Sequence, residues 1–297
     1  MKKIFTVIFA SFLMVSTINC QTSQNDFPVL KGPYLGQKPP GSTPEIFAPG
    51  IVSTNENKEF CSTFSLNDDV FYFNREGKIM ECRFDGSRWL NPVPASFALD
   101  YMEHEAHITP DGSKLFFGSR RPQPGNTSAN QYGIWMMERK ENGWGEPVHV
   151  GSGMYVTTSL NSNIYITSFA EDAGSLVRTV LKDGKFSTME KLKGGVNSPN
   201  ADCHPCIAPD ESYIIFDSNR PGSHLGEGTF DLYVCFKLAD GSWGTAINIG
   251  EKLNANAENT VASITRDGKY LFYNSKHNGT WDIYWVSTKI IEELRPK

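Results

Sequence analysis

The sequence lacks the hallmarks of a nucleic-acid-binding protein and of a protein that crosses a membrane repeatedly. Its 28 Lys and Arg residues are outnumbered by 33 Asp and Glu, the formal net charge is −5, and no basic run occurs. The electrostatic footprint that nucleic acids require is therefore absent. After the N-terminus no apolar run is long enough to span a bilayer. We expect no nucleic-acid partner, and membrane contact only through an N-terminal lipid.

The sequence also lacks recognised catalytic signatures and a disulfide framework. No nucleophile elbow, phosphate loop or metalloprotease helix is present. Of six cysteines, Cys20 belongs to the leader, which leaves an odd number and at least one free thiol. Charged residues make up 21% and aromatic residues 12% of the chain, so a large core is available and disorder is not expected.

The N-terminus reads as an export signal. Lys2 and Lys3 precede the apolar run "IFTVIFASFLMV", which is too short to span a membrane. The run ends in "STINC", which resembles a bacterial lipobox and implies a lipid on Cys20; cleavage without lipid is the alternative. We assign residues 1–20 to the signal peptide and 21–43 to a tether and a Pro/Gly-rich crossing, and expect the protein in the periplasm or at the outer membrane.

The rest of the chain repeats itself. "HITPDGSKLFFGSRRPQPG" from residue 107, "PCIAPDESYIIFDSNRPG" from 205 and "SITRDGKYLFYNSKHNG" from 263 share a turn followed by an apolar strand. A fainter copy begins at residue 63, and the faintest at 158. The turn residues Asn67, Asp111, Asn161, Asp210 and Asp267 are 44 to 57 residues apart. A period of this length with several short strands per copy predicts a β-propeller.

Each copy predicts one blade of four antiparallel strands, a to d from the inside outward. Strand b is apolar on both faces, as expected between two neighbouring blades. The last copy ends at "WDIYWVST" without strand d, and "PEIFAPGIVS" (44–53) resembles the missing strand. We predict an all-β propeller over residues 44–288, with five blades, or six as the alternative. The N-terminal strand closes the ring, which removes exposed sheet edges, and residues 289–297 form a tail.

The recurring "PDG…LFF.S.R.G…DLYV" pattern resembles the TolB-type, WD-like propeller repeats of bacterial envelope proteins. The resemblance covers about residues 44–288 and is strongest in the second, fourth and fifth copies. It implies a propeller that docks partners or ligands. It does not imply one chemistry, because propellers serve as enzymes and as scaffolds.

One end of the predicted propeller gathers charge. Antiparallel connectivity brings the d–a and b–c loops to the same end; there, acids precede strand a and bases follow strand b. Arg121 and Lys276 belong to this base pattern. We weigh structural ion pairs against a polar funnel that binds a ligand. The candidate funnel residues are Glu59, Arg75, Glu103, Glu105, His107, Arg120, Asp202, His204, Arg220 and Glu258.

Two segments carry additional titratable groups, "EHEAH" (103–107) and "DCHPC" (202–206). The repeat aligns Glu105 with His204 and His107 with Cys206. Imidazole and thiolate bind zinc, but residues three apart on a strand point to opposite faces. We expect no metal and no cofactor; His107, His204 and Cys206 are the candidates if a metal is bound.

Two functions remain open. The favoured one is a non-catalytic, monomeric envelope lipoprotein that binds a protein, peptide or glycan. The alternative is a carbohydrate-active propeller, a polysaccharide lyase or glycosidase, that uses funnel carboxylates as acid and base. Acids that are each paired with an Arg would favour the binding protein.

Overall fold

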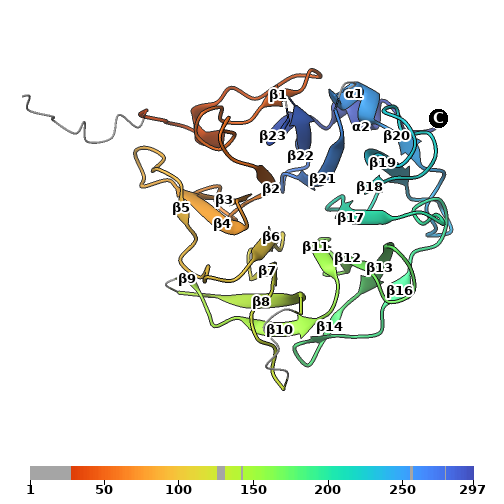
Figure 1. The fold of residues 1–297 in the computed structure, drawn as a ribbon, viewed down its shortest axis with the longest axis horizontal. Coiled ribbons are helices and arrows are strands. Elements are labelled where there is room, and N and C mark those ends of the chain that lie inside the picture. Colours follow the sequence, from red (N-terminus) through yellow and green to blue (C-terminus); the bar gives the residue numbers. More distant parts are fainter. Residues whose placement is uncertain (1–27, 126–130, 142, 255–256, 278) are drawn as a thin grey trace, which may run out of the picture.

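A computed structural model describes residues 28–297 apart from 126–130, 142, 255–256 and 278. The predicted signal peptide and Cys20 lie outside the described residues. The described chain forms a ring of five sheets around a central axis (Figure 1). The predicted all-β propeller with five blades is confirmed.

The strands of each blade are given in order from the innermost to the outermost. Blade 1 contains β2 (Glu59–Phe64), β3 (Val70–Arg75), β4 (Lys78–Arg83) and β5 (Val93–Pro94). Blade 2 contains β6 (Glu103–Ile108), β7 (Lys114–Ser119), β8 (Gly133–Lys140) and β10 (Val148–Gly151), with β9 (Gly143–Trp144) extending β8 as a hairpin. Blade 3 contains β11 (Met154–Thr158), β12 (Ile164–Ser168), β13 (Ser175–Thr179) and β16 (Glu190–Lys191), beside the hairpin of β14 (Leu181–Lys182) and β15 (Lys185–Phe186).

Blade 4 contains β17 (Asp202–Ile207), β18 (Tyr213–Ser218), β19 (Asp231–Phe236) and β20 (Ile247–Asn248). Blade 5 contains β21 (Asn259–Ile264), β22 (Tyr270–His277), β23 (Thr280–Ser287) and β1 (Glu45–Ile46). The described residues also form three short helices: η1 (Tyr34–Gly36), α1 (Gly250–Asn254) and α2 (Lys289–Glu292). Among the described residues, the helices are all too short or too polar to span a bilayer.

The N-terminal strand closes the ring, as predicted. Strand β1 pairs antiparallel with β23, and the Phe47 amide then donates to the Ile283 carbonyl at 2.8 Å. The Phe47 side chain is fully buried, and its ring lies 5.2 Å from that of Trp285 and 5.0 Å from that of Phe71. One aromatic residue from the start of the chain thus packs between blade 5 and blade 1.

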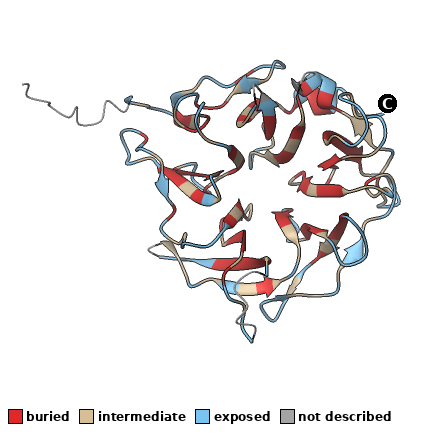
Figure 2. Cartoon of the chain, in the orientation of Figure 1, coloured by how far each residue is buried: buried red, intermediate tan, exposed pale blue. Residues whose placement is uncertain are grey.

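The core lies between the blades rather than at the centre of the ring. The b strands, such as "YIIF" in β18, are apolar on both faces and buried on both sides (Figure 2). Five clusters of buried side chains fill the interfaces between successive blades. Burial of each large side chain contributes roughly 1.5–3 kcal/mol. In the tail, Ile290 and Ile291 of α2 join the cluster between blades 4 and 5.

The a–b turns follow from local side-chain chemistry. The Asp111 carboxylate accepts the Ser113 amide at 3.0 Å, and Asp267 accepts the Lys269 amide at 3.1 Å. Gly112 between the first pair has φ +71°, a conformation that glycine adopts without strain. These turns define the turn end of the propeller, and the d–a and b–c loops define its loop end.

Candidate functional site

Buried pairs between an acid and an Arg occupy three blades at the loop end. Glu59, Glu103 and Asp202 each begin an inner strand and are fully buried. Their partners are respectively Arg75 at 2.8 Å, Arg121, and Arg220 at 2.6 Å. Each acid also accepts a backbone amide from the d–a loop before it, so the pair fixes that loop to the blade.

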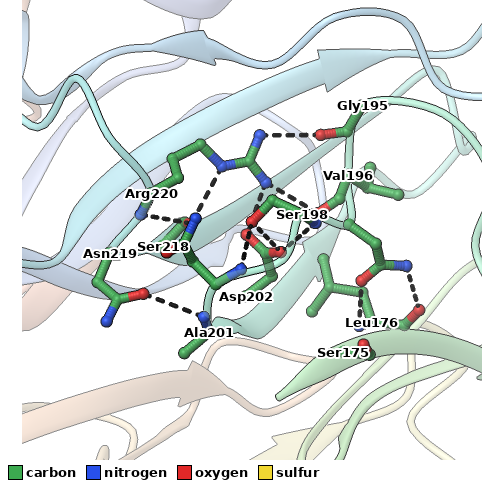
Figure 3. Close-up of polar contacts among 12 residues, drawn as sticks. Ser175, Leu176, Gly195, Val196, Ser198, Ala201, Asp202, Ser218, Asn219 and Arg220 are labelled. Carbon is green, nitrogen blue, oxygen red and sulfur yellow. Dashed lines mark hydrogen bonds and ion pairs between the residues drawn. The ribbon is translucent and has the colours of Figure 1, made fainter. Parts of the chain in front are cut away.

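The blade 4 pair shows how completely these groups are satisfied (Figure 3). The Arg220 guanidinium donates to the Gly195 carbonyl at 2.9 Å and to the Val196 carbonyl at 3.2 Å, in addition to Asp202. It also lies over the Phe216 ring at 5.0 Å. Asp202 accepts the Ser198 amide at 2.5 Å. The predicted pattern of acids and bases therefore forms structural pairs here, and these carboxylates are occupied by protein partners.

Three of the predicted funnel residues, Arg120, Glu258 and His107, take no part in these three pairs. The partner of Glu103 is Arg121, whereas Arg120 lines a separate cavity described below. In blade 5 the residue that begins the inner strand is Asn259, so Glu258 precedes the strand and accepts the Phe230 amide at 3.2 Å. His107 lies toward the turn end. Sequence spacing does not resolve positions to within one residue, which accounts for Arg120 and Glu258, whereas His107 is the fifth residue of β6 and lies past the bulge.

A bulge recurs near the start of every inner strand, at the third residue of β2, β6, β17 and β21 and at the second residue of β11. Cys61, Glu105, Tyr155, His204 and Val261 all have φ between 48° and 63°, and the pairing register shifts at each. Glu105 and His204 are thus equivalent, as the repeat alignment predicted. Each of the five has low exposure, at most 8% for four of them, with 16% for the His204 side chain. Together these five bulge residues form a layer between the two ends of the channel.

The backbone amide of each bulge residue is bonded by a side chain from the preceding blade. In four blades that side chain comes from one position of the b strand: Asn74, Thr167, Asp217 and Asn274 accept the amides of Glu105, His204, Val261 and Cys61 at 2.8 to 3.1 Å. These bonds satisfy amides that the bulge removes from the ladder. They also fix neighbouring blades to one another.

Blade 2 departs from this arrangement. Its b-strand position is Gly118, and a Cβ there would lie 1.7 Å from the Tyr132 hydroxyl oxygen. The Tyr132 hydroxyl instead donates to Glu105 Oε2 at 3.0 Å, and the same oxygen accepts the Tyr155 amide at 3.0 Å. The fifth bond between blades is therefore made by a buried carboxylate and a phenol.

Glu105 is also the end of a row of three titratable side chains. Asp217 accepts from His204 Nδ1 at 2.8 and 3.0 Å, and His204 Nε2 faces Glu105 Oε1 at 3.7 Å. Burial by itself would lower the pKa of His204, but the Asp217 carboxylate beside it raises that pKa above the ordinary histidine value. The pKa of Glu105 is raised above the ordinary value because the effect of burial is larger than the opposing effects of His204, the Tyr132 hydroxyl and the Tyr155 amide.

A cavity of about 690 Å³ opens above Glu105 at the loop end, between blades 2 and 3. Its apolar walls include Met102, Met154, Phe169 and Met189, and its polar groups include His104, Glu105, Arg120, Tyr132, Ser152 and Ser168. Phe169 is 50% exposed and Met102 48% exposed, among the most exposed large apolar residues described. The volume lies within the range of ordinary ligand sites.

A second cavity, of about 360 Å³, lies at the turn end on the other side of the bulge layer. His107 and Cys206 line it together with hydroxyl residues such as Thr157. His107 Nε2 lies 3.1 Å from the Thr158 amide, and burial lowers the pKa of His107 to about 4. Among the described residues, no three His, Cys, Asp or Glu side chains come together as a metal site. His107, His204 and Cys206 are thus not assembled as one ligand set.

Comparisons with known proteins rest on the fold. No family model and no curated protein matches the sequence. A chain assigned as TolB from Agrobacterium tumefaciens is similar over 80% of this chain and 79% of its own, at 14% identity and a TM-score of 0.54. The fold is a TolB-like β-propeller.

Two further structures are more distant from this TolB-like propeller. TolB from Acinetobacter baumannii has 10% identity and a TM-score of 0.49 over 79% of this chain; the propeller spans only 55% of that TolB chain. A gluconolactonase from Xanthomonas campestris has 12% identity and a TM-score of 0.46, over 75% of this chain and 69% of its own. Likeness at these levels carries no argument about activity.

Proposed function

We propose that this protein is an exported, lipid-anchored propeller that binds a segment of a partner protein at its loop-end cavity. The leader ending in Cys20 motivates the export and the anchor. The observation that carries the binding function is the departure of blade 2, where Gly118, Tyr132 and Glu105 replace the repeated bond between blades beneath an open cavity. Three of the four repeated bonds are made by neutral side chains, Asn74, Thr167 and Asn274, so holding the blades together does not by itself require a carboxylate.

The composition of the cavity favours a protein segment as its occupant. Aromatic residues, Met and Arg are the types enriched in protein interfaces, and the cavity combines Phe169, Tyr132 and Arg120 with three methionines. Methionine side chains are flexible and polarisable, which suits contact with an apolar anchor. An exposed apolar rim around a polar floor is typical of a docking site.

The enzymatic alternative receives less support. Glu59, Glu103 and Asp202, the acids named for that role, are each paired with an Arg. Asp217 is 1% exposed and bonded to His204, so the cavity offers Glu105 as its lining carboxylate. Hydrolysis by two carboxylates needs both groups at the same glycosidic bond. A non-catalytic binding protein remains the proposal.

In-cell photocrosslinking tests the binding site. Intact cells would carry the full chain with a photoreactive phenylalanine at Phe169, and a matched control would carry it at Leu160, which is 64% exposed at the turn end. We expect a defined protein adduct from position 169 and none, or a weaker one, from position 160. Equal adducts at both positions, or none at 169, would refute the site.

Metabolic labelling with a clickable fatty acid tests the anchor separately. We expect label on the wild-type protein and none on Cys20→Ser. Equal labelling of the two proteins, or none in either, would refute lipidation and leave the binding site untouched.

A further inference from the structure

Glu105 lines the floor of the loop-end cavity, and the 16% exposed side chain of His204 lies beside its Oε1 atom. Glu105 Oε2 is saturated by the Tyr132 hydroxyl and the Tyr155 amide, but Oε1 accepts no hydrogen bond from any residue that the structure describes. Its nearest polar neighbour is His204 Nε2 at 3.7 Å, beyond hydrogen-bonding distance. Asp217 accepts from Nδ1, and its carboxylate raises the pKa of His204, which favours the doubly protonated ring whose Nε2–H faces this gap.

The charges around this gap balance. Two carboxyl groups, Glu105 and Asp217, face two basic groups, the His204 ring between them and Arg120 on the cavity wall. His104, which also lines the cavity, adds no charge near neutral pH, because burial and the charge of Arg120 lower its pKa. A group that enters the cavity therefore contacts polar atoms but experiences little net electrostatic attraction or repulsion.

This balance selects against a charged group. An ammonium would lose its hydration between methionine walls, meet a Glu105 that His204 already compensates, and face Arg120. A carboxylate would suffer the same desolvation, and although Arg120 lines the cavity, a carboxylate has no proton to donate to Glu105 Oε1 and would place two carboxylate oxygens against each other. An uncharged group that both donates and accepts can reach Oε1 and the Nε2 proton without adding net charge to the cavity, and each open atom then gains a partner.

We infer that the loop-end cavity takes an uncharged peptide segment, with one apolar side chain between Phe169 and the methionines and an amide group on Glu105 Oε1 and His204 Nε2. The inference rests on the proposed function, since it names the chemistry of the partner segment at that same site. A primary carboxamide, such as an Asn or Gln side chain, carries an N–H donor and a carbonyl acceptor side by side, which matches Glu105 Oε1 and His204 Nε2; a trans backbone amide directs the two groups to opposite sides.

Three probes with the same side chain test the selection. N-acetyl-leucinamide is neutral, leucinamide is cationic and N-acetyl-leucine is anionic at pH 6.5. Purified mature chain would be labelled at the methionine methyl groups. Met102, Met154 and Met189 report on the cavity, whereas Met136 and Met137 are buried in blade 2 and serve as internal controls. We expect the neutral probe to shift the three cavity signals in the millimolar range, and both charged probes to bind at least fivefold more weakly.

Two variants assign the contacts. Glu105→Gln keeps an acceptor oxygen and loses the charge, so the neutral probe should bind roughly three- to tenfold more weakly. Because Glu105 is buried, Phe169→Ala provides a second test at an exposed side chain, with Leu160→Ala at the turn end as its matched control. Phe169→Ala should weaken binding and Leu160→Ala should leave it unchanged.

The outcomes separate this inference from the proposed function. Tighter binding of leucinamide or of N-acetyl-leucine, or no shift of the cavity methionines with any probe, would overturn the inference. A crosslinked partner at position 169 together with such a result would keep the proposed function and discard only the amide selection. Failure of both experiments would discard the site.

Discussion

Replacing Arg220 by Ala should destabilise the propeller far more than an ordinary surface substitution does. The Arg220 side chain is 13% exposed and its partner Asp202 is fully buried. Removing the guanidinium leaves the Asp202 carboxylate buried with only the Ser198 amide and hydroxyl as donors, and frees the Gly195 and Val196 carbonyls. Breaking one partner of a buried pair costs about 3–5 kcal/mol. For a chain of this size each kcal/mol lowers the melting temperature by about 2–4 °C, so we expect a loss of about 6–20 °C.

The matched control is Arg178→Ala in blade 3. Arg178 also pairs with an acid, Glu190, at 2.7 Å, but the two side chains are 43% and 66% exposed. Such surface pairs contribute about 0–1 kcal/mol. Urea unfolding followed by tryptophan fluorescence, with calorimetry for the melting temperature, measures both variants. If Arg220→Ala and Arg178→Ala differ from the wild type by the same small amount, the view that the acid–Arg pairs hold the blades is refuted.

Three further outcomes are expected. Phe47→Ala should cost about 3–5 kcal/mol in urea unfolding, because the fully buried ring joins blade 5 to blade 1, whereas the exposed Phe169→Ala should cost little; equal costs would contradict closure through Phe47. The pKa of His204 is raised in the folded state, so its contribution is complete below the unfolded value of about 6.5 and is lost as pH rises through the folded pKa. The destabilisation caused by His204→Gln should therefore be larger at pH 6 than at pH 9. A destabilisation that is constant with pH would contradict the interaction of His204 with Asp217 and Glu105. The pKa of His107 is lowered to about 4, so its contribution holds above about pH 6.5 and is lost as pH falls toward 4. In His107→Gln the free energy of unfolding should therefore fall less steeply between pH 6.5 and pH 4 than in the wild type. The same pH dependence in both proteins would refute this account.

The fold was accessible from the sequence because its signals are local. Each b strand and the turn before it lie within about a dozen residues, and the chemistry of Asp111 with Gly112 recurs in blade 5 as Asp267 with Gly268. Closure was predictable because the last copy lacks a strand that residues 44–53 resemble. The acids and bases of the loop end were also visible, but spacing did not reveal that Arg121 rather than Arg120 pairs with Glu103, or that Asn259 takes the place of the acid in blade 5, since loop geometry decides which side chain turns inward.

The site was less accessible because its contacts join distant blades. Glu105 and His204 are about a hundred residues apart and meet only because both occupy bulges with positive φ, which spacing alone does not reveal. Asp217 and Tyr132 were missed altogether. One signal existed: the b-strand position holds a polar residue in four copies and Gly118 in the second.

The break in the repeat is the strongest reason to place function in blade 2. In a propeller, features that several blades share hold the blades together, and the acid–Arg pairs and the bonds to the bulge amides are of this kind. An Asn at position 118 could have supplied the fifth such bond, as Asn74 and Asn274 do in their blades. The chain instead buries the Glu105 carboxylate, whose desolvation is unfavourable, and uses Tyr132 and His204 to compensate. Stability alone does not explain that choice, whereas a ligand that bonds the open Glu105 oxygen does.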